Sequence, residues 1–358
     1  MDLVSLAYVA LFGVTLVPPA IGVVIPFPVN VMLTSFLIVY IGSHLSLEAN
    51  EVVGVQPSPL HSTHHSPAPQ ENGETMTMKD AAWFPIVGSA ALLSLFVAIK
   101  YLGPYYVNLL LSAYFFVLGV IAVGASLSPF FARLVDGVKA YKFNLPFVGE
   151  FELTAADIVG GVFGVAFASY YVATKHFLAN NLLGIAFCLQ GVERTSLGGY
   201  GVGALLLVGL FFYDIYWVFF TPVMVGVAKN IDGPIKLLFP RALATADSDA
   251  VFSMLGLGDI VLPGIFIALL LRYDAHRSGI DTTVSRSTRK DFPKTMFNTN
   301  LFAYTVGLLV TLVVMLKFQH AQPALLYLVP ACVGCSLLVA PFAGGYGSLF
   351  AYKEGKEE

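Results

Sequence analysis

Two aspartates stand inside long apolar stretches of this sequence, where a carboxyl group is costly. Asp214 lies within residues 210–220 and Asp259 within residues 254–263. An ionisable side chain at the centre of a membrane helix costs about 2.5–3.5 kcal/mol on insertion scales, so such residues usually serve a function. Two of them in consecutive apolar stretches indicate a pair with a shared chemical role.

A pair of carboxyl groups in contact can perform acid–base chemistry. The two groups cannot readily be ionised at the same time, so one keeps its proton while the other is charged. The charged group can take a proton from a water while its partner donates one to a carbonyl oxygen, as in aspartic proteases. This chemistry needs no metal, cofactor, serine or thiol. Asp214 and Asp259 are therefore the predicted catalytic residues.

The neighbours of the two acids suit such a site. Gly256 and Gly258 remove side chains at three and one positions before Asp259, so backbone or substrate can approach closely. Packing between helices is the alternative explanation for these glycines. Tyr213 could donate a hydrogen bond to Asp214 or be one more packing aromatic.

A third element opens the last apolar stretch, at residues 322–325. Pro323 suits an ordinary helix start, because the first helical position needs no amide donor. Alternatively, a bend at this proline leaves backbone groups free near the acids, where an extended substrate could pair with them by strand addition. Tyr213, Tyr216 and Gln322 are candidates to line a path for water.

The composition defines the broad class of protein. The 358 residues are 57% hydrophobic and only 11% charged, against about 25% charged in soluble domains. With a mean hydropathy of +0.78, the chain is predicted to be a polytopic membrane protein in contact with the lipid bilayer. No basic tract indicates nucleic acid. Cys332 and Cys335 are expected to pack on one helix face, and His61, His64 and His65 to be incidental residues of a linker, so no metal site is predicted.

Nine helical spans are predicted, each near the ~20 residues that cross the hydrocarbon layer. They lie at residues 29–47, 82–100, 105–126, 155–173, 177–191, 200–222, 251–271, 300–317 and 323–342. The pattern gives five parts: an apolar or interfacial segment at 1–28, spans one to three at 29–126 with a disordered linker at 52–80, spans four and five at 127–196, a catalytic part at 197–342 and a cytosolic tail at 343–358. An additional span at 3–25 is the alternative for the first segment.

Two connections carry expectations of their own. Residues 143–152 are expected to be extended, and residues 223–250 form either an interfacial helix that gates entry or a passive connection. About two thirds of the 19 Lys and Arg residues fall on the side of the C-terminal tail, which predicts a cytosolic C-terminus and an N-terminus on the opposite side. Counted along their spans, Asp214 and Asp259 each lie ~12 Å from the same, non-cytosolic end.

Three motifs together resemble those of a known family of membrane enzymes. Tyr213-Asp214, Gly256-Leu257-Gly258-Asp259 and Pro323-Ala324-Leu325 are similar to motifs of the intramembrane aspartyl proteases of the presenilin and signal peptide peptidase group. Longer strings at 113–119, 179–184, 211–219, 254–259 and 320–331 resemble its signal peptide peptidase branch. The similarity covers residues 29–342.

The resemblance implies an all-α, presenilin-like fold of nine transmembrane helices that hydrolyses peptide bonds within transmembrane helices. It implies Asp214 and Asp259 as the catalytic pair, without a cofactor. The supporting residues expected around them are Tyr213, Gly256, Leu257, Gly258, Gln322, Pro323, Ala324 and Leu325. Without the resemblance, a proton-coupled transporter or channel, or an adaptor that only binds signal-peptide-like helices, stays open.

The same resemblance implies partners and a location. The substrates would be remnant signal peptides and type II or tail-anchored proteins of the endoplasmic reticulum membrane, with the N-terminus of the enzyme in the lumen. A homo-oligomer, a quality-control complex and an enzyme that acts alone are all compatible with the sequence. The sequence departs from relatives in lacking an Asn-x-Ser/Thr sequon, and its tail has Lys356 without the second lysine of a dilysine signal.

Overall fold

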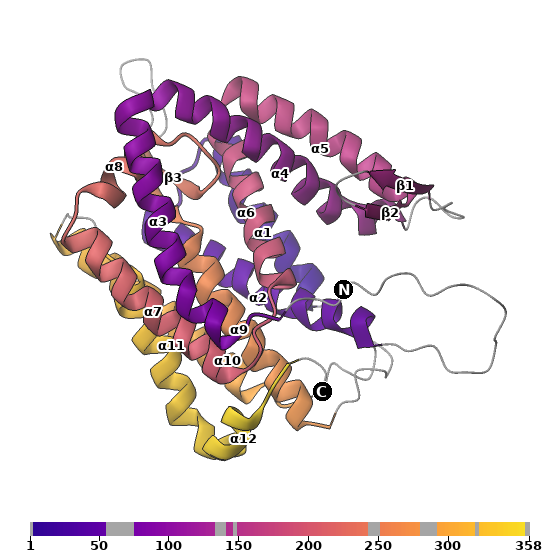
Figure 1. Ribbon diagram of the computed structural model, residues 1–358, viewed down its shortest axis with the longest axis vertical. Helices are drawn as coiled ribbons and strands as arrows, with labels where there is room; N and C mark the ends of the chain where they lie inside the picture. Colours follow the sequence, from indigo (N-terminus) through magenta and orange to yellow (C-terminus); the bar gives the residue numbers. More distant parts are fainter. Residues whose placement is uncertain are drawn as a thin grey trace.

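The computed structural model describes residues 3–54, 75–132, 141–145, 149–242, 251–279, 292–318 and 322–354. Helices dominate these residues (Figure 1). They are α1 Leu3–Ala20, α2 Phe27–Gly54, α3 Met78–Leu102, α4 Pro104–Ala132, α5 Ala155–Thr174, α6 Phe177–Arg194, α7 Tyr200–Phe219, α8 Val223–Asn230, α9 Gly258–Arg277, α10 Thr295–Phe318, α11 Leu325–Val339, a 3-10 turn Ala340–Phe342 and α12 Gly345–Ala351. The strands are β1 Tyr141–Leu145, β2 Gly149–Leu153, β3 Lys236–Ala242 and β4 Val251–Gly256.

Eight helices among the described residues are long and apolar enough to cross a membrane. They are α1, α2, α3, α4, α5, α7, α10 and α11 with the turn that follows it. This set differs from the nine predicted spans, because it includes α1, expected to be partial or interfacial, and leaves out α6 and α9. The chain is thus a largely helical, polytopic membrane protein.

One predicted span was wrong in its first part. Residues 251–256 form strand β4 instead of the first turns of a helix, and α9 begins only at Gly258. β4 pairs antiparallel with β3, with Lys236 opposite Gly256 and Leu238 opposite Met254. A short apolar run fits a strand as well as a buried helix, and the sequence periodicity cannot separate the two. The all-α prediction is corrected accordingly, because β1 and β2 also form an antiparallel pair, which overlaps the segment expected to be extended.

The connection between α7 and β4 is also more ordered than a simple loop. It contains the short helix α8 and the strand β3, and residues 243–250 lie outside the described part. The predicted linker at 52–80 is too long at both ends, because α2 continues to Gly54 and α3 begins at Met78. A capping box between Thr77 and Asp80 fixes that start of α3. The three linker histidines lie outside the described residues.

Helix α9 occupies the centre of the bundle, in contact with α2, α6, α7, α10 and α11 (Figure 1). Its residues from Phe266 to Leu271 are fully buried. A helix that is apolar on all sides belongs in the interior, whereas α3 exposes most of its apolar side chains, as expected of a helix that faces lipid. Because Asp259 is near the first residue of α9, it lies at one end of this buried helix.

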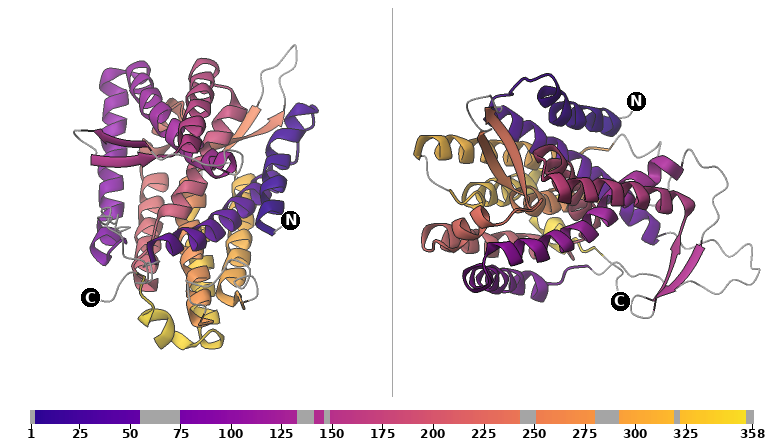
Figure 2. Two further views of the ribbon diagram at one scale, coloured as in Figure 1. Left: turned by 90° about the vertical axis from the view of Figure 1, so that its right-hand side faces the viewer. Right: turned by 90° about the horizontal axis from the view of Figure 1, so that it is seen from above.

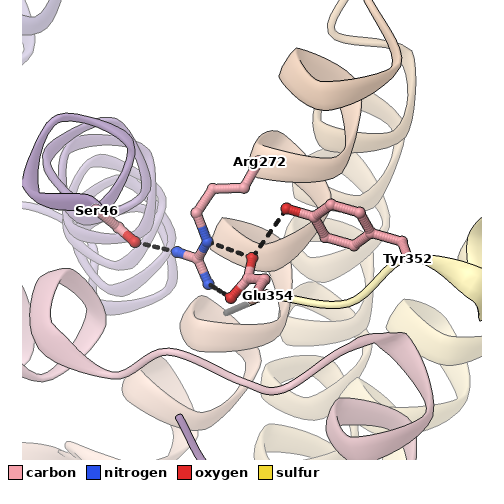
Figure 3. Close-up of polar contacts among 4 residues, drawn as sticks. All are labelled: Ser46, Arg272, Tyr352 and Glu354. Atoms are coloured by element: carbon pink, nitrogen blue, oxygen red, sulfur yellow. Dashed lines mark hydrogen bonds and ion pairs between the residues drawn. The ribbon is translucent and has the colours of Figure 1, made fainter. Parts of the chain in front are cut away.

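The far end of α9 is tied to the C-terminal tail (Figure 3). Arg272 donates from Nε to Glu354 Oε1 at 2.6 Å and from Nη2 to Glu354 Oε2 at 2.9 Å, and it also donates to Ser46. Tyr352 donates to the same carboxylate at 3.2 Å. The tail backbone lies against the start of α7, where Glu354 N donates to Gly198 O at 3.3 Å. We refer to Arg272 and residues 352–354 as the C-terminal clasp.

Candidate active site

Asp214 lies in the last turns of α7 with its side chain buried. Its Oδ2 accepts a hydrogen bond from the backbone N of Leu325 at 3.0 Å. Leu325 is the first residue of α11, and the first N–H groups of a helix have no partner within that helix. The positive end of the helix dipole adds to the attraction for a carboxylate. The start of α11 is therefore fixed against the acid of α7.

Asp259 is the second residue of α9 and is partly buried. Only Leu257 and Gly258 separate it from the end of β4, so the strand pair and the helix together set the position of its backbone. Tyr304 of α10 donates from its hydroxyl to the carbonyl oxygen of Asp259 at 3.3 Å. A methyl group placed on Gly256 would lie 3.5 Å from Asp259 Oδ2, so the glycine leaves the side of this carboxyl open.

The two carboxyl groups come together at the junction of three helices. α7 packs against α9, and α11 contacts both. The negative charge of Asp214 acts on Asp259, so the side chains are within electrostatic reach of each other. The depth argument needs correction, because Asp259 lies near the first residue of its helix instead of well inside it. The packing of α7 against α9 brings Asp214, in the last turns of α7, within electrostatic reach of Asp259, in the first turn of α9.

The remaining predicted site residues divide into two groups. Pro323, Ala324 and Leu325 are buried beside Asp214, and Gln322 is partly buried ahead of them. The Ala324 carbonyl accepts the N–H of Tyr327 and of Leu328 at 3.1 Å, which leaves the Leu325 N–H directed at the acid. This segment lies at the carboxyl pair.

Tyr213 and Leu257 instead face the scaffold. The ring of Tyr213 packs against Trp217 at 6.3 Å and borders Gly88 of α3. Leu257 directs its side chain towards Gly184 of α6 and donates its backbone N–H to Ile235 at 3.0 Å. Gly258 opens α9 and borders Leu262. These residues hold the backbone on which the acids stand.

Sequence reasoning missed two features of the site. Tyr304 contacts the Asp259 backbone from α10, and the β3–β4 pair leads into α9. Neither carries a local motif, since both depend on contacts between distant segments. The sequence carries one indication of the β3–β4 pair, which is the polar Asn180-Asn181 pair inside the apolar α6. Buried amides require hydrogen-bond partners, so a backbone segment had to pack beside them.

The described residues contain no group of three or more His, Cys, Asp and Glu side chains that could hold a metal ion. Cys332 is buried, and Cys335 donates from Sγ to the carbonyl of Thr299 at 3.5 Å, so the two cysteines take part in helix packing. The chemistry that the site offers is that of two carboxyl groups, one backbone N–H and the water that reaches them.

Together these features define a polytopic membrane protein with a pair of carboxyl groups among its helices. Residues 68–356 match the family described as Signal peptide peptidase. The chain is 45% identical to the Signal peptide peptidase of Mus musculus and 43% identical to that of Homo sapiens, each over 293 residues that cover 78% of this chain and 74% of the relative. It is 38% identical to Intramembrane protease 2 of Caenorhabditis elegans over 66% of this chain and 58% of that protein. The chain belongs to the signal peptide peptidase family, a family of intramembrane proteases that act on substrates within the bilayer.

Proposed function

We propose that this protein is an aspartic endopeptidase that hydrolyses peptide bonds inside transmembrane helices with a water held between Asp214 and Asp259. The observation that supports the proposal is that Asp214 accepts a hydrogen bond from the first residue of α11 and lies within electrostatic reach of Asp259. Two acids in electrostatic contact share a proton, which is the state that aspartic protease chemistry requires.

The hydrogen bond from Leu325 distinguishes the roles of the two acids. A backbone N–H bonds more strongly to an ionised carboxylate than to a neutral acid, so it stabilises negative charge on Asp214. We therefore assign Asp214 as the group that takes a proton from water and Asp259 as the group that donates one to the carbonyl oxygen of the substrate. The oxygen of the water then bonds to the carbonyl carbon.

Breakdown of this intermediate completes the hydrolysis. The bond between carbon and nitrogen breaks as the nitrogen receives the proton that Asp214 took from the water, and the intermediate returns a hydroxyl proton to Asp259. The products are a carboxylic acid and an amine, and the pair regains its single shared proton. General acid–base catalysis of this kind accelerates a reaction by roughly 10²–10⁴-fold for each group involved.

The substrate has to unwind before it can be cut. A transmembrane helix satisfies all its backbone hydrogen bonds internally, so an intact helix shields its peptide bonds. β4 ends three residues before Asp259 and pairs with β3 along one edge. An unwound segment is held by strand addition to backbone groups beside the acids, either along the other edge of β4 or at residues 322–325.

We propose remnant signal peptides and type II or tail-anchored membrane proteins as substrates. The names of the curated relatives, Signal peptide peptidase, support the first class. The protein resides in the endoplasmic reticulum membrane, with a lumenal N-terminus and a cytosolic C-terminus as the Lys/Arg distribution favours. In this arrangement α6 and α9 are spans, and they complete a bundle of nine helices from α2 to α11 with α8 outside the count.

Cleavage of a defined substrate tests the proposal. The detergent-solubilised protein is incubated with a labelled signal-peptide helix, and the masses of the products are measured. Loss of cleavage in both Asp214→Ala and Asp259→Ala, with the substrate still bound, is the expected result. Cleavage that persists in either variant contradicts the proposed pair. A wild-type protein that binds the helix without cutting it would be an adaptor, and proton flux in liposomes without cleavage would indicate a transporter.

A further inference from the structure

Two consecutive asparagines of α6 bind the backbone of strand β3. Asn180 donates from Nδ2 to the carbonyl of Lys236 at 2.8 Å. Asn181 donates from Nδ2 to the carbonyl of Leu238 at 2.7 Å, and its Oδ1 accepts the N–H of the same residue at 2.8 Å. Both asparagines are buried, at 5% and 7% exposure, within a helix that is otherwise apolar over this stretch.

The contact of Asn181 with Leu238 reproduces the pairing of a β-strand. In an antiparallel sheet, a hydrogen-bonded residue exchanges both its N–H and its C=O with one partner on the neighbouring strand. Here one side-chain amide supplies both partners. Asn180 is held in turn by the hydroxyl of the buried Tyr171, which donates to its Oδ1 at 3.3 Å. The edge of β3 opposite β4 is therefore occupied by α6.

A short chain of contacts connects this amide clamp to Asp259. Lys236 lies opposite Gly256 in the β3–β4 pair, and the N–H of Leu257 donates to Ile235 at 3.0 Å. Asp259 follows two residues after Leu257. A shift of β3 along α6 thus moves the backbone that carries the acid, because the side-chain amides hold β3, β3 pairs with β4, and a backbone hydrogen bond ties Leu257 to Ile235.

Side-chain packing at Gly184, one turn further along α6, fixes the same register. A methyl group added to Gly184 would lie 2.8 Å from Leu237 Cδ2 and 3.3 Å from Leu257 Cδ2. The glycine therefore provides the space into which one side chain from β3 and one from the Gly-Leu-Gly segment fit. The amides hold the backbone of the strand, and this space holds its side chains.

We propose that Asn180 and Asn181 are positioning residues that set the register of the β3–β4 pair on α6 and thereby select which peptide bond of a bound substrate faces Asp259. The inference rests on the proposed proteolytic function and adds a determinant of the cleavage position to it. A misplacement of about 1 Å at a reacting centre can cost 10²-fold in rate, so a small shift in register changes which bond is cut.

A purely structural role predicts a different outcome. Loss of two buried hydrogen bonds reduces the amount of folded protein and lowers the total product. It does not change the ratio of products cut at neighbouring bonds, because that ratio is a property of the molecules that remain folded. The product ratio therefore separates positioning from stability.

Asn108 of α4 supplies a matched control. Its Nδ2 donates to the carbonyl of Asn230 at 2.8 Å, and its Oδ1 accepts the N–H of Asp232 at 3.0 Å. This is also a two-bond clamp of an asparagine on backbone, but it is more exposed, joins two residues and holds the turn after α8 instead of the strand. Asn108→Leu therefore removes the same number of hydrogen bonds to backbone without breaking one to β3.

The experiment compares Asn181→Leu, Gly184→Ala and Asn108→Leu with the wild type on one labelled transmembrane helix, with product masses as the readout. We expect the share of product cut at neighbouring bonds to rise roughly threefold or more in Asn181→Leu and in Gly184→Ala, and to stay at the wild-type value in Asn108→Leu. Gly184→Ala breaks no hydrogen bond, so it decides the matter if Asn181→Leu yields no folded protein.

Two results would overturn the inference. One is an unchanged product ratio in both α6 variants, and the other is an equal change in Asn108→Leu. Cleavage that persists in Asp259→Ala, measured in the same assay, would instead count against the proposed function, so the two failures are distinct.

Discussion

Ionisable groups lie near both ends of α9, in two different kinds of surroundings. At one end Asp259 lies near a second acid, Asp214, and the described residues supply one hydrogen bond to the Asp214 carboxyl, from the Leu325 N–H. At the other end, about 20 Å away along the helix, Arg272 meets both oxygens of Glu354 and the hydroxyl of Ser46 (Figure 3). In the part of the chain that the structure describes, the acid pair has no positive charge beside it, whereas the carboxylate of Glu354 is paired with the guanidinium of Arg272.

The difference indicates which set does chemistry. A buried ion pair whose charges and donors are satisfied fixes geometry, and breaking it leaves an uncompensated charge. Like charges that are forced together are unfavourable for folding and are retained where their reactivity serves a function. On this comparison the C-terminal clasp fixes the position of α9, and the acid pair depends on that position for its geometry.

The largest expected effect is on activity at the acid end. Asp214→Asn keeps the volume of the side chain but cannot take a proton, so we expect cleavage to fall by at least about 10²-fold. The melting temperature should stay close to that of the wild type, because the change also removes repulsion between two acids. Cleavage assays and thermal unfolding in detergent measure the two quantities. Substantial residual turnover in Asp214→Asn would contradict the assignment of the chemistry to the acid end of α9.

The next effect is on stability at the clasp end. Arg272→Ala leaves the Glu354 carboxylate buried without a positive charge to pair with, which should destabilise the fold by about 3–5 kcal/mol. Thermal or denaturant unfolding of the purified variant measures this loss. The activity of the fraction that stays folded should exceed that of Asp214→Asn by a wide margin. An unchanged stability would show that the clasp does not hold α9.

Removal of both partners of the clasp tests whether the loss of stability comes from the unpaired charge. Arg272→Met combined with Glu354→Leu replaces the ion pair by apolar groups, and such replacements are often neutral or stabilising by 1–4 kcal/mol. We therefore expect the double variant to recover most of the stability that Arg272→Ala loses. A double variant as unstable as the single one would mean that the hydrogen bonds to Ser46 and Tyr352 matter more than the charges.

The smallest effect concerns a neutral contact at the acid end. Tyr304→Phe removes the hydroxyl that donates to the Asp259 carbonyl, and a hydrogen bond of this kind contributes about 0.5–1.5 kcal/mol. We expect kcat/KM to fall by no more than about tenfold and the unfolding midpoint to change little. Comparison with Tyr327→Phe, in α11, controls for general loss of a phenol. A loss as large as that of Asp214→Asn would give Tyr304 a chemical role.

Much of this arrangement could be predicted because it follows from local chemistry. An acid in an apolar stretch is visible at Asp214 and Asp259. The lengths of the apolar stretches place α3, α5, α6, α7 and α11 within about four residues, whereas α2, α4 and α10 extend further than predicted. The family of the chain was also predicted from its motifs, and the comparisons confirm it. The roles of the two acids stay predictions that the variants above test.

The parts that escaped prediction depend on contacts between distant residues. Residues 251–256 look like the start of a span until β3 is known to pair with them. Arg272 and Glu354 are 82 positions apart, so nothing local marks them as partners. Asn180 and Asn181 occur in an apolar segment, but their bond to β3 follows only from the fold. Periodicity and composition report local environment, whereas pairing is a property of the assembled chain.

The hydrogen bond between Leu325 and Asp214 has a consequence for the time at which the enzyme becomes active. The two residues are 111 positions apart, so at about 5–20 residues per second the ribosome completes Leu325 roughly 6–22 s after Asp214. Asp259 is made within that interval, and from then until Leu325 is complete both acids are part of the nascent chain while the backbone donor that orients one of them has not been made. On the proposed mechanism, the nascent chain is inactive as a protease while it is inserted into the membrane. It cannot cut neighbouring transmembrane helices until its own last helix has been inserted.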